Sequence, residues 1–186
     1  MKRIAIFASG NGSNAENIIR YFRERPERGE VVLVVSNKAG AGVLERAARL
    51  GVESRVMTRA EINDPEIMSE VLESRGVDTL VLAGFLLMVP SFLIERYPDR
   101  IVNIHPSLLP KYGGKGMYGR HVHEAVVAAG ERESGITIHF VNEHCDEGQI
   151  IFQATVEIAE TDTPADVEAK IHRLEKLHFP RVIDEI

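Results

Sequence analysis

Short apolar runs alternate along the chain with segments in which apolar residues recur every three or four positions. The runs are rich in β-branched residues, and three of them are almost continuously apolar, as in parallel strands covered on both faces. They predict strands at Arg3–Ala8, Val31–Ser36, Glu53–Val56, Thr79–Ala83 and Ile101–His105. The intervening segments have the spacing of amphipathic helices, at Ala15–Glu24, Gly42–Leu50, Pro65–Arg75 and Ser91–Tyr97.

The pattern changes after Pro106. It predicts a glycine-rich loop, a helix near His121–Ala129, strands at Gly135–Val141 and Gln149–Glu157, and a terminal helix from about Pro164. Strands that alternate with helices favour right-handed βαβ units. The predicted fold class is therefore α/β: an open, mostly parallel Rossmann-like sheet with helices on both faces and a mixed-direction C-terminal part.

Composition narrows the class of protein. A chain of 186 residues, 44% hydrophobic, is long enough for one core, and we expect one domain over 1–186 with halves 1–100 and 101–186. The chain has no apolar run of membrane-spanning length, no signal-peptide pattern and a single cysteine, Cys145, which together predict a cytoplasmic protein. A net charge of −6 argues against a nucleic-acid partner, and we expect no membrane partner.

An amide and an imidazole lie two residues apart in Asn103-Ile104-His105-Pro106. Side chains at i and i+2 of a strand point to the same face, so Asn103 and His105 can converge on one small reacting group. Pro106 forces His105 into an extended conformation and ends the strand. The pair is therefore predicted at the carboxyl edge of a strand.

The first strand leads into Ser9-Gly10-Asn11-Gly12-Ser13-Asn14 and then into a helix. Glycines allow close approach of an anion, and the helix start offers unpaired N–H groups, so the turn is a candidate phosphate site. The spacing also fits a dinucleotide fingerprint, but Ser36-Asn37-Lys38 supplies no acidic residue for a ribose. An ordinary capped turn remains an alternative.

A polar cluster between the last two strands, residues 142–149, offers a carboxylate for His105. Asp146 is the candidate, because a carboxylate beside an imidazole raises its pKa and fixes its tautomer. A solvent-exposed acidic turn is the alternative.

Taken together, these motifs resemble those of the phosphoribosylglycinamide formyltransferases, or GAR transformylases, within the folate-dependent formyltransferase family. The resemblance covers nearly the whole chain. It is carried by SGNGSN at Ser9–Asn14, LAGF at Leu82–Phe85, NIHPSLLP at Asn103–Pro110, HVH at His121–His123, GITIHFV at Gly135–Val141 and DEGQII at Asp146–Ile151.

The resemblance implies transfer of a formyl group from 10-formyltetrahydrofolate, as co-substrate, to glycinamide ribonucleotide in de novo purine biosynthesis. The implied residues are Asn103, His105 and Asp146 for catalysis; Asn11, Gly12, Ser13 and Asn14 for the substrate phosphate; Glu175 for the glycinamide end; and Arg59, Leu86, Leu87, Met88, Val89, Val141 and Asn142 for the folate, within loops 86–89 and 141–146. The first half then binds the nucleotide and the second carries catalysis and folate binding. No metal is required, and a monomer or homodimer is expected.

Some residues need not be functional. His121, His123 and His144 are read as polar packing residues rather than metal ligands, and His139 as a hydrogen-bonded strand histidine. Cys145 is read as a passive lining residue. Leu87 stands where some relatives carry a basic residue. The glycine-rich loop 111–119 is longer than in many relatives and is either a lid or a surface excursion.

Two alternatives of another class remain. A hydrolase of formyltetrahydrofolate would use the same three groups with water as nucleophile, but such relatives carry an extra N-terminal domain. A non-catalytic nucleotide-binding module would leave Asn103, His105 and Asp146 unexplained as a group. Sugar-nucleotide and initiator-tRNA formyltransferases share the central motif but usually have further domains.

Overall fold

The computed structural model describes all residues from 1 to 186. Its strands form a seven-stranded sheet in the order β3-β2-β1-β4-β5-β6-β7. By internal contacts the chain divides into two compact units, Met1–Val102 and Asn103–Ile186, so the division falls within β5 (Ile101–His105). The single domain with halves 1–100 and 101–186 stays a prediction.

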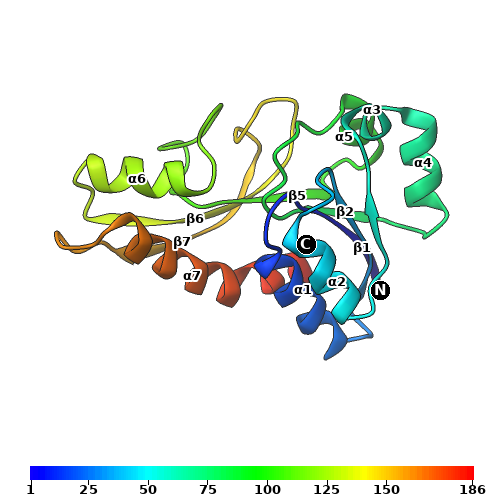
Figure 1. Ribbon diagram of the computed structural model, residues 1–186, viewed down its shortest axis with the longest axis horizontal. Coiled ribbons are helices and arrows are strands. Elements are labelled where there is room, and N and C mark those ends of the chain that lie inside the picture. Colours follow the sequence, from blue (N-terminus) through cyan, green and yellow to red (C-terminus); the bar gives the residue numbers. More distant parts are fainter. The chain divides into compact units, whose positions relative to one another are not determined.

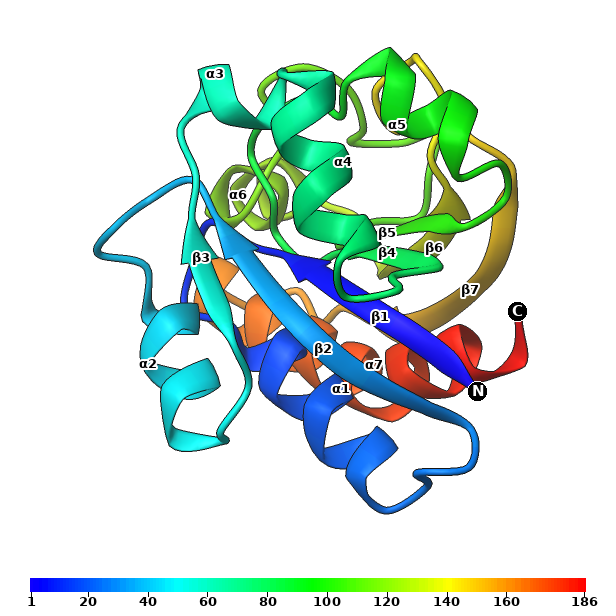
Figure 2. The same cartoon turned by 90° about the vertical axis from the view of Figure 1, so that its right-hand side faces the viewer.

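The first unit is a parallel α/β layer. It contains β1 (Lys2–Phe7), α1 (Ser13–Arg23), β2 (Gly29–Ser36), α2 (Gly42–Arg49), β3 (Ser54–Val56), α3 (Arg59–Ile62), α4 (Pro65–Glu73), β4 (Thr79–Leu82) and α5 (Ser91–Arg96). Strand β1 pairs in parallel with both β2 and β4, and β2 pairs with β3. Helices α1 and α2 cover one face of these strands, and α3 to α5 lie on the other (Figure 2). The central strands are therefore enclosed and almost wholly buried.

The second unit is built on an antiparallel hairpin. It contains α6 (Arg120–Ala128), β6 (Glu133–Phe140), β7 (Ile150–Glu157) and α7 (Pro164–Glu185). Strands β6 and β7 pair from Glu133 with Glu157 to His139 with Ile150, and the register shifts beside His139. Helix α7 runs along this hairpin (Figure 1). It also contacts α6. A capping box between Thr163 and Asp166 begins α7.

The predicted fold class is confirmed. Every predicted strand and helix is present, with ends that differ by a few residues, and the C-terminal strands run antiparallel as the mixed-direction part required. The sequence prediction missed α3, a single turn of helix capped by Thr58 and Glu61. Four residues are too few to show a helical period, so only the capping pair could have indicated this turn.

No helix of the chain combines the length and the apolar character needed to cross a membrane.

Candidate active site

Asn103 and His105 lie on β5, at the start of the second unit. The amide of Asn103 does not stand alone, because its Nδ2 donates to Nε2 of His139 on the neighbouring hairpin at 3.1 Å. Nδ1 of His139 donates in turn to the Phe140 carbonyl at 2.8 Å. In the neutral form of this ring, the two bonds place the proton on Nδ1. An amide nitrogen has two protons, so Asn103 keeps one to donate elsewhere.

His105 is buried and both of its nitrogens face protein atoms. Its Nε2 donates to the backbone carbonyl of Tyr112 at 2.7 Å, which places the proton of the neutral ring on Nε2. Its Nδ1 lies 3.5 Å from Oδ2 of Asp146. The prediction that Asp146 reaches His105 is confirmed in the structure, and the alternative of a solvent-exposed acidic turn is wrong for this residue, whose side chain is only 10% exposed.

Asp146 is placed by its loop. Its backbone is left-handed, with φ of 57°, and its Oδ2 accepts from the Gly114 N–H at 3.0 Å. Gly148 makes the loop's return feasible, because a Cβ there would lie 1.6 Å from the Phe140 carbonyl oxygen. Oδ1 of Asp146 also lies 3.8 Å from Nε2 of His139. The carboxylate therefore stands between two imidazoles.

The pKa of His105 moves in the direction opposite to the sequence prediction. Burial lowers the pKa of the imidazole below its usual value, and the nearby charge of Asp146 and the Tyr112 carbonyl only partly offset this. Burial pushes the pKa of the Asp146 carboxyl upward, but its contacts with His139, His105 and the Gly114 N–H outweigh burial and leave it lowered. The site at neutral pH is a neutral imidazole beside an ionised carboxylate.

This pair can move a proton. Nδ1 of His105 carries a lone pair, and a proton accepted there would be stabilised by Asp146 at 3.5 Å. Asn103 supplies a neutral donor close to the same groups. The cluster thus has the parts for an addition to a carbonyl carbon: a donor for a developing oxyanion and an acceptor for a proton.

The glycine turn after β1 lies in the first unit. Gly12 has φ of 80° and would place a Cβ 2.6 Å from Val43, so only glycine fits. Asn11 uses its side chain to accept from the Ser13 N–H at 2.9 Å, and its carbonyl accepts from Arg46 Nε at 2.7 Å. The turn is thus a rigid start to α1, as an anion site needs.

Ser9 joins this turn to the segment after β4. Its hydroxyl donates to Asn37 Oδ1 at 2.5 Å and accepts from the Leu86 N–H at 3.0 Å. The sequence did not predict the hydrogen bonds of Ser9 with Asn37 and Leu86, or that of Arg46 with the Asn11 carbonyl. A small polar residue and an arginine on a helix give no sequence signal for hydrogen bonds to distant residues.

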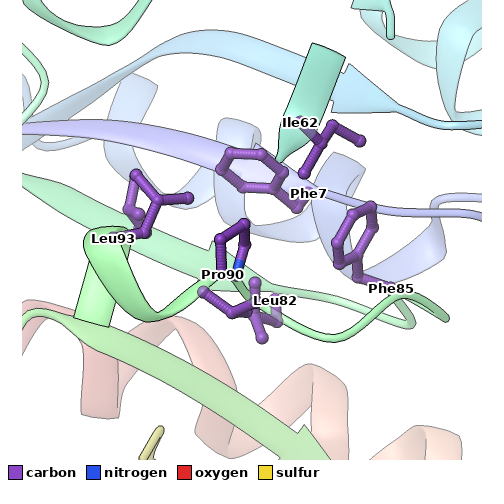
Figure 3. A pocket seen from close by; sticks show the side chains of 8 residues that line it. Phe7, Ile62, Leu82, Phe85, Pro90 and Leu93 are labelled. Atoms are coloured by element: carbon purple, nitrogen blue, oxygen red, sulfur yellow. The ribbon is translucent and has the colours of Figure 1, made fainter. Parts of the chain in front are cut away.

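The residues expected to contact folate have varied surroundings. Leu86 and Met88 are exposed, at 46% and 54%, and Arg59 is exposed at the start of α3. Val89 borders a small apolar cavity of about 10 Å³ between Phe7, Phe85 and Leu93 (Figure 3). That space barely equals one water and is lined by core residues, so it is a packing gap rather than a ligand pocket.

In the second unit, Asn142 is occupied by its own loop: its side chain accepts from the His144 N–H at 2.8 Å. Val141 is half-buried at the start of this loop. Glu175 is buried on α7. The folate and glycinamide roles of these residues stay predictions.

The sequence predicted no catalytic role for the other histidines or for Cys145. His139 is the hydrogen-bonded strand histidine that was predicted, although its link to Asn103 was not. No group of three or more His, Cys, Asp or Glu side chains is arranged to hold a metal ion. Cys145 is exposed, with its Sγ 3.6 Å from Asp146 Oδ2, and partial loss of solvent around the sulfur, together with that carboxylate, raises the pKa of the thiol.

Comparisons with known proteins identify the family. The family model described as formyl transferase matches residues 2–183. A chloroplastic phosphoribosylglycinamide formyltransferase of Arabidopsis thaliana is 43% identical over 95% of this chain. The enzyme of that name from Bacillus subtilis is 36% identical over 100% of this chain and 95% of its own length. The crystal structure of glycinamide ribonucleotide transformylase 1 from Symbiobacterium toebii superposes with a TM-score of 0.89 at 36% identity, covering 99% of this chain and 86% of that one.

The chain therefore belongs to the formyl transferase family. It spans 63% of the length of the Arabidopsis relative.

Proposed function

We propose that the protein transfers the formyl group of 10-formyltetrahydrofolate to the amine of glycinamide ribonucleotide, giving formylglycinamide ribonucleotide and tetrahydrofolate in de novo purine biosynthesis. The observation that carries the proposal is the cluster of Asn103, His105 and Asp146 within one unit of a formyl transferase chain. The choice of substrate is supported by two relatives named phosphoribosylglycinamide formyltransferase, which are 43% and 36% identical to this chain.

In the proposed reaction the neutral amine attacks the formyl carbon and forms a C–N bond. The carbonyl oxygen becomes negative and the attacking nitrogen positive. The second amide proton of Asn103 stabilises the oxygen, an effect of about 10²–10³ in rate for a donor of this kind. The amide is fixed for this role because its first proton is bound to His139.

The proton on the attacking nitrogen must reach the departing folate nitrogen. His105 accepts it on Nδ1, directly or through a water, and Asp146 stabilises the resulting imidazolium. The imidazolium then gives the proton to the folate nitrogen as the C–N bond to the folate breaks. His105 thus acts first as a base and then as an acid, which suits a ring that burial keeps neutral at the outset.

The proposal assigns the substrate phosphate to Asn11, Gly12, Ser13 and Asn14, since a helix start preceded by glycine favours an anion. It assigns the glycinamide end to Glu175. It assigns the folate to Arg59, Leu86–Val89, Val141 and Asn142, where the exposed side chains of Leu86 and Met88 offer apolar surface to a ring.

The proposal includes action without a metal, with small molecules as partners, as a monomer or homodimer in the cytoplasm. A single cysteine suits a reducing compartment. The Arabidopsis relative is named chloroplastic, so location in an organelle is the competing possibility.

The test is an assay of folate absorbance with and without glycinamide ribonucleotide. We expect release of tetrahydrofolate only when the amine is present, with one formylated product formed per folate released. Equal turnover without the amine would refute transfer and establish a hydrolase.

A further inference from the structure

The backbone of Tyr112 has a conformation that needs support. Its φ is 56°, in the left-handed region, where a non-glycine residue costs about 1–2 kcal/mol. This conformation directs the Tyr112 carbonyl onto Nε2 of His105 at 2.7 Å. The bond defines which nitrogen of the imidazole is protonated, so whatever holds Tyr112 also sets the state of His105.

One carboxylate, that of Glu131, binds the side chains of both Lys111 and Tyr112. Oε1 of Glu131 accepts from the Tyr112 hydroxyl at 2.9 Å and from Lys111 Nζ at 3.1 Å. Glu131 lies between α6 and β6, in the turn that follows Gly130, and its side chain is only 25% exposed. The bond from the Tyr112 hydroxyl to this carboxylate is charge-assisted, whereas the Lys111 ion pair is a surface contact, because the Lys111 side chain is 66% exposed.

The backbone before Tyr112 is fixed independently. Ser107 Oγ donates to the Lys111 carbonyl at 2.6 Å, and Thr137 Oγ1 donates to the Ser107 carbonyl at 2.7 Å. These bonds tie the segment before Tyr112 to β6, and after Tyr112 the Gly114 N–H donates to Oδ2 of Asp146 at 3.0 Å. The bonds to Glu131 are the contacts that the Lys111 and Tyr112 side chains themselves make.

We propose that Glu131 is a positioning residue: by holding Lys111 and Tyr112 it keeps the Tyr112 carbonyl on Nε2 of His105, and so keeps Nδ1 as the atom that faces Asp146. The catalytic meaning of this inference rests on the proposed formyl transfer, whereas its effect on the imidazole does not. Without Glu131, Tyr112 relaxes to negative φ, its carbonyl leaves Nε2, and His105 populates both tautomers.

The matched variants are Glu131→Ala, Tyr112→Phe and Glu131→Gln. Glu131→Ala removes both bonds, whereas Tyr112→Phe removes only the phenol bond. Glu131→Gln keeps an oxygen acceptor and should rescue most of the effect. The control is Glu160→Ala, which breaks the ion pair of Glu160 with Arg132, the residue next to Glu131.

The first readout is the ¹⁵N NMR spectrum of the His105 ring in the full chain without substrates. We expect the Nε2-protonated tautomer in the unaltered protein, in Glu160→Ala and largely in Glu131→Gln. Glu131→Ala and Tyr112→Phe should show a mixture. The second readout is turnover, where kcat should fall about 10- to 100-fold in Glu131→Ala while KM for the amine stays within about twofold.

An unchanged tautomer in a folded Glu131→Ala would overturn the proposal, as would loss of kcat with no change in the ring. If Glu131→Ala fails to fold, Tyr112→Phe decides by the same criteria. If the unaltered protein lacks transferase activity, the proposed function fails, but the NMR comparison still decides whether Glu131 positions His105.

Discussion

At the scale of single residues, the site depends on how each polar atom is occupied. Asn103 gives one proton to His139 and retains the other, and His105 gives its only proton to Tyr112 and retains a lone pair beside Asp146. The two residues therefore have complementary roles, one as donor and one as acceptor. In the proposed reaction, exchange of either for a residue without that atom removes a defined chemical step.

His105→Ala and Asp146→Asn should reduce kcat/KM by about 10²–10⁴, because each disables proton transfer. Neither should prevent folding, since the surrounding strands are held by other contacts. The measurement is steady-state kinetics together with urea unfolding of the same samples. Asp99→Asn is a suitable control, because Asp99 is exposed and its φ of 53° is tolerated by asparagine. Near-normal turnover in either site variant would remove that residue from the mechanism.

The sequence predicted that these three residues lie close together, but it did not predict their electrostatics. Spacing brings Asn103 and His105 to one face, and the composition of loop 142–149 leaves Asp146 as a candidate. The rise in the pKa of His105 was predicted wrongly, because burial of the ring depends on packing from distant segments. The Tyr112 carbonyl was also unpredictable, since neither its left-handed φ nor its direction is encoded by the residue type.

At the scale of elements, the turn between β1 and α1 shows how glycine shapes a candidate binding site. Gly10 and Gly12 both lie in the turn, yet only Gly12 has a positive φ and a neighbour that a Cβ would strike. The resemblance points to Gly12 for the phosphate, and the backbone independently requires glycine there. Gly10 has nothing within 4 Å of an added Cβ.

Gly12→Ala should therefore destabilise the protein by about 2 kcal/mol or more, from left-handed strain and the contact with Val43. It should also raise KM for the nucleotide far more than KM for the folate, if the turn binds phosphate. Gly10→Ala is the matched control and should change stability by less than about 1 kcal/mol. Urea unfolding and kinetics against each substrate give the measurements, and equal effects of the two substitutions would contradict this account.

The sequence also predicted the elements well because their apolar periods are long and regular. It could not predict the bonds that join them, such as that of Ser9 to Asn37 and Leu86, because hydrogen bonds between distant residues have no periodic signature. For the same reason the link from the segment between α6 and β6 to His105, through Glu131 and Tyr112, emerged only from the structure.

At the scale of the whole molecule, buried neutral imidazoles couple stability to pH. His105 and His123 are 4% and 3% exposed, and burial lowers the pKa of both rings. His123 on α6 lacks a hydrogen-bond partner at Nδ1, and the charge of Glu168, which raises its pKa, is opposed by His172 and His105. Protonation of either ring would place a poorly compensated charge in the interior.

Stability should therefore fall as the solution is acidified below the ordinary histidine pKa of 6.5. Below pH 6.5 the histidines of the unfolded chain bind more protons than the buried histidines of the folded chain. The free energy of unfolding therefore rises with pH and levels off above about 7. Each imidazole contributes a slope of up to about 1.4 kcal/mol per pH unit. Asp146, whose pKa is lowered, adds its own loss only below its ordinary value of 3.8. The pH range in which the histidines lower stability is thus separate from the range in which Asp146 does.

Urea unfolding between pH 5 and 8 tests this coupling, with His123→Gln as the variant that removes one titrating ring and leaves the proposed catalytic residues unchanged. The slope below pH 6.5 should decrease by about one proton in this variant. The exposed His121, two residues away on the same helix, gives the matched control, because His121→Gln removes a ring that solvent already accommodates. A stability that rises on acidification from pH 7.5 to 5.5 would contradict the coupling, since it would require the folded chain to bind the additional protons.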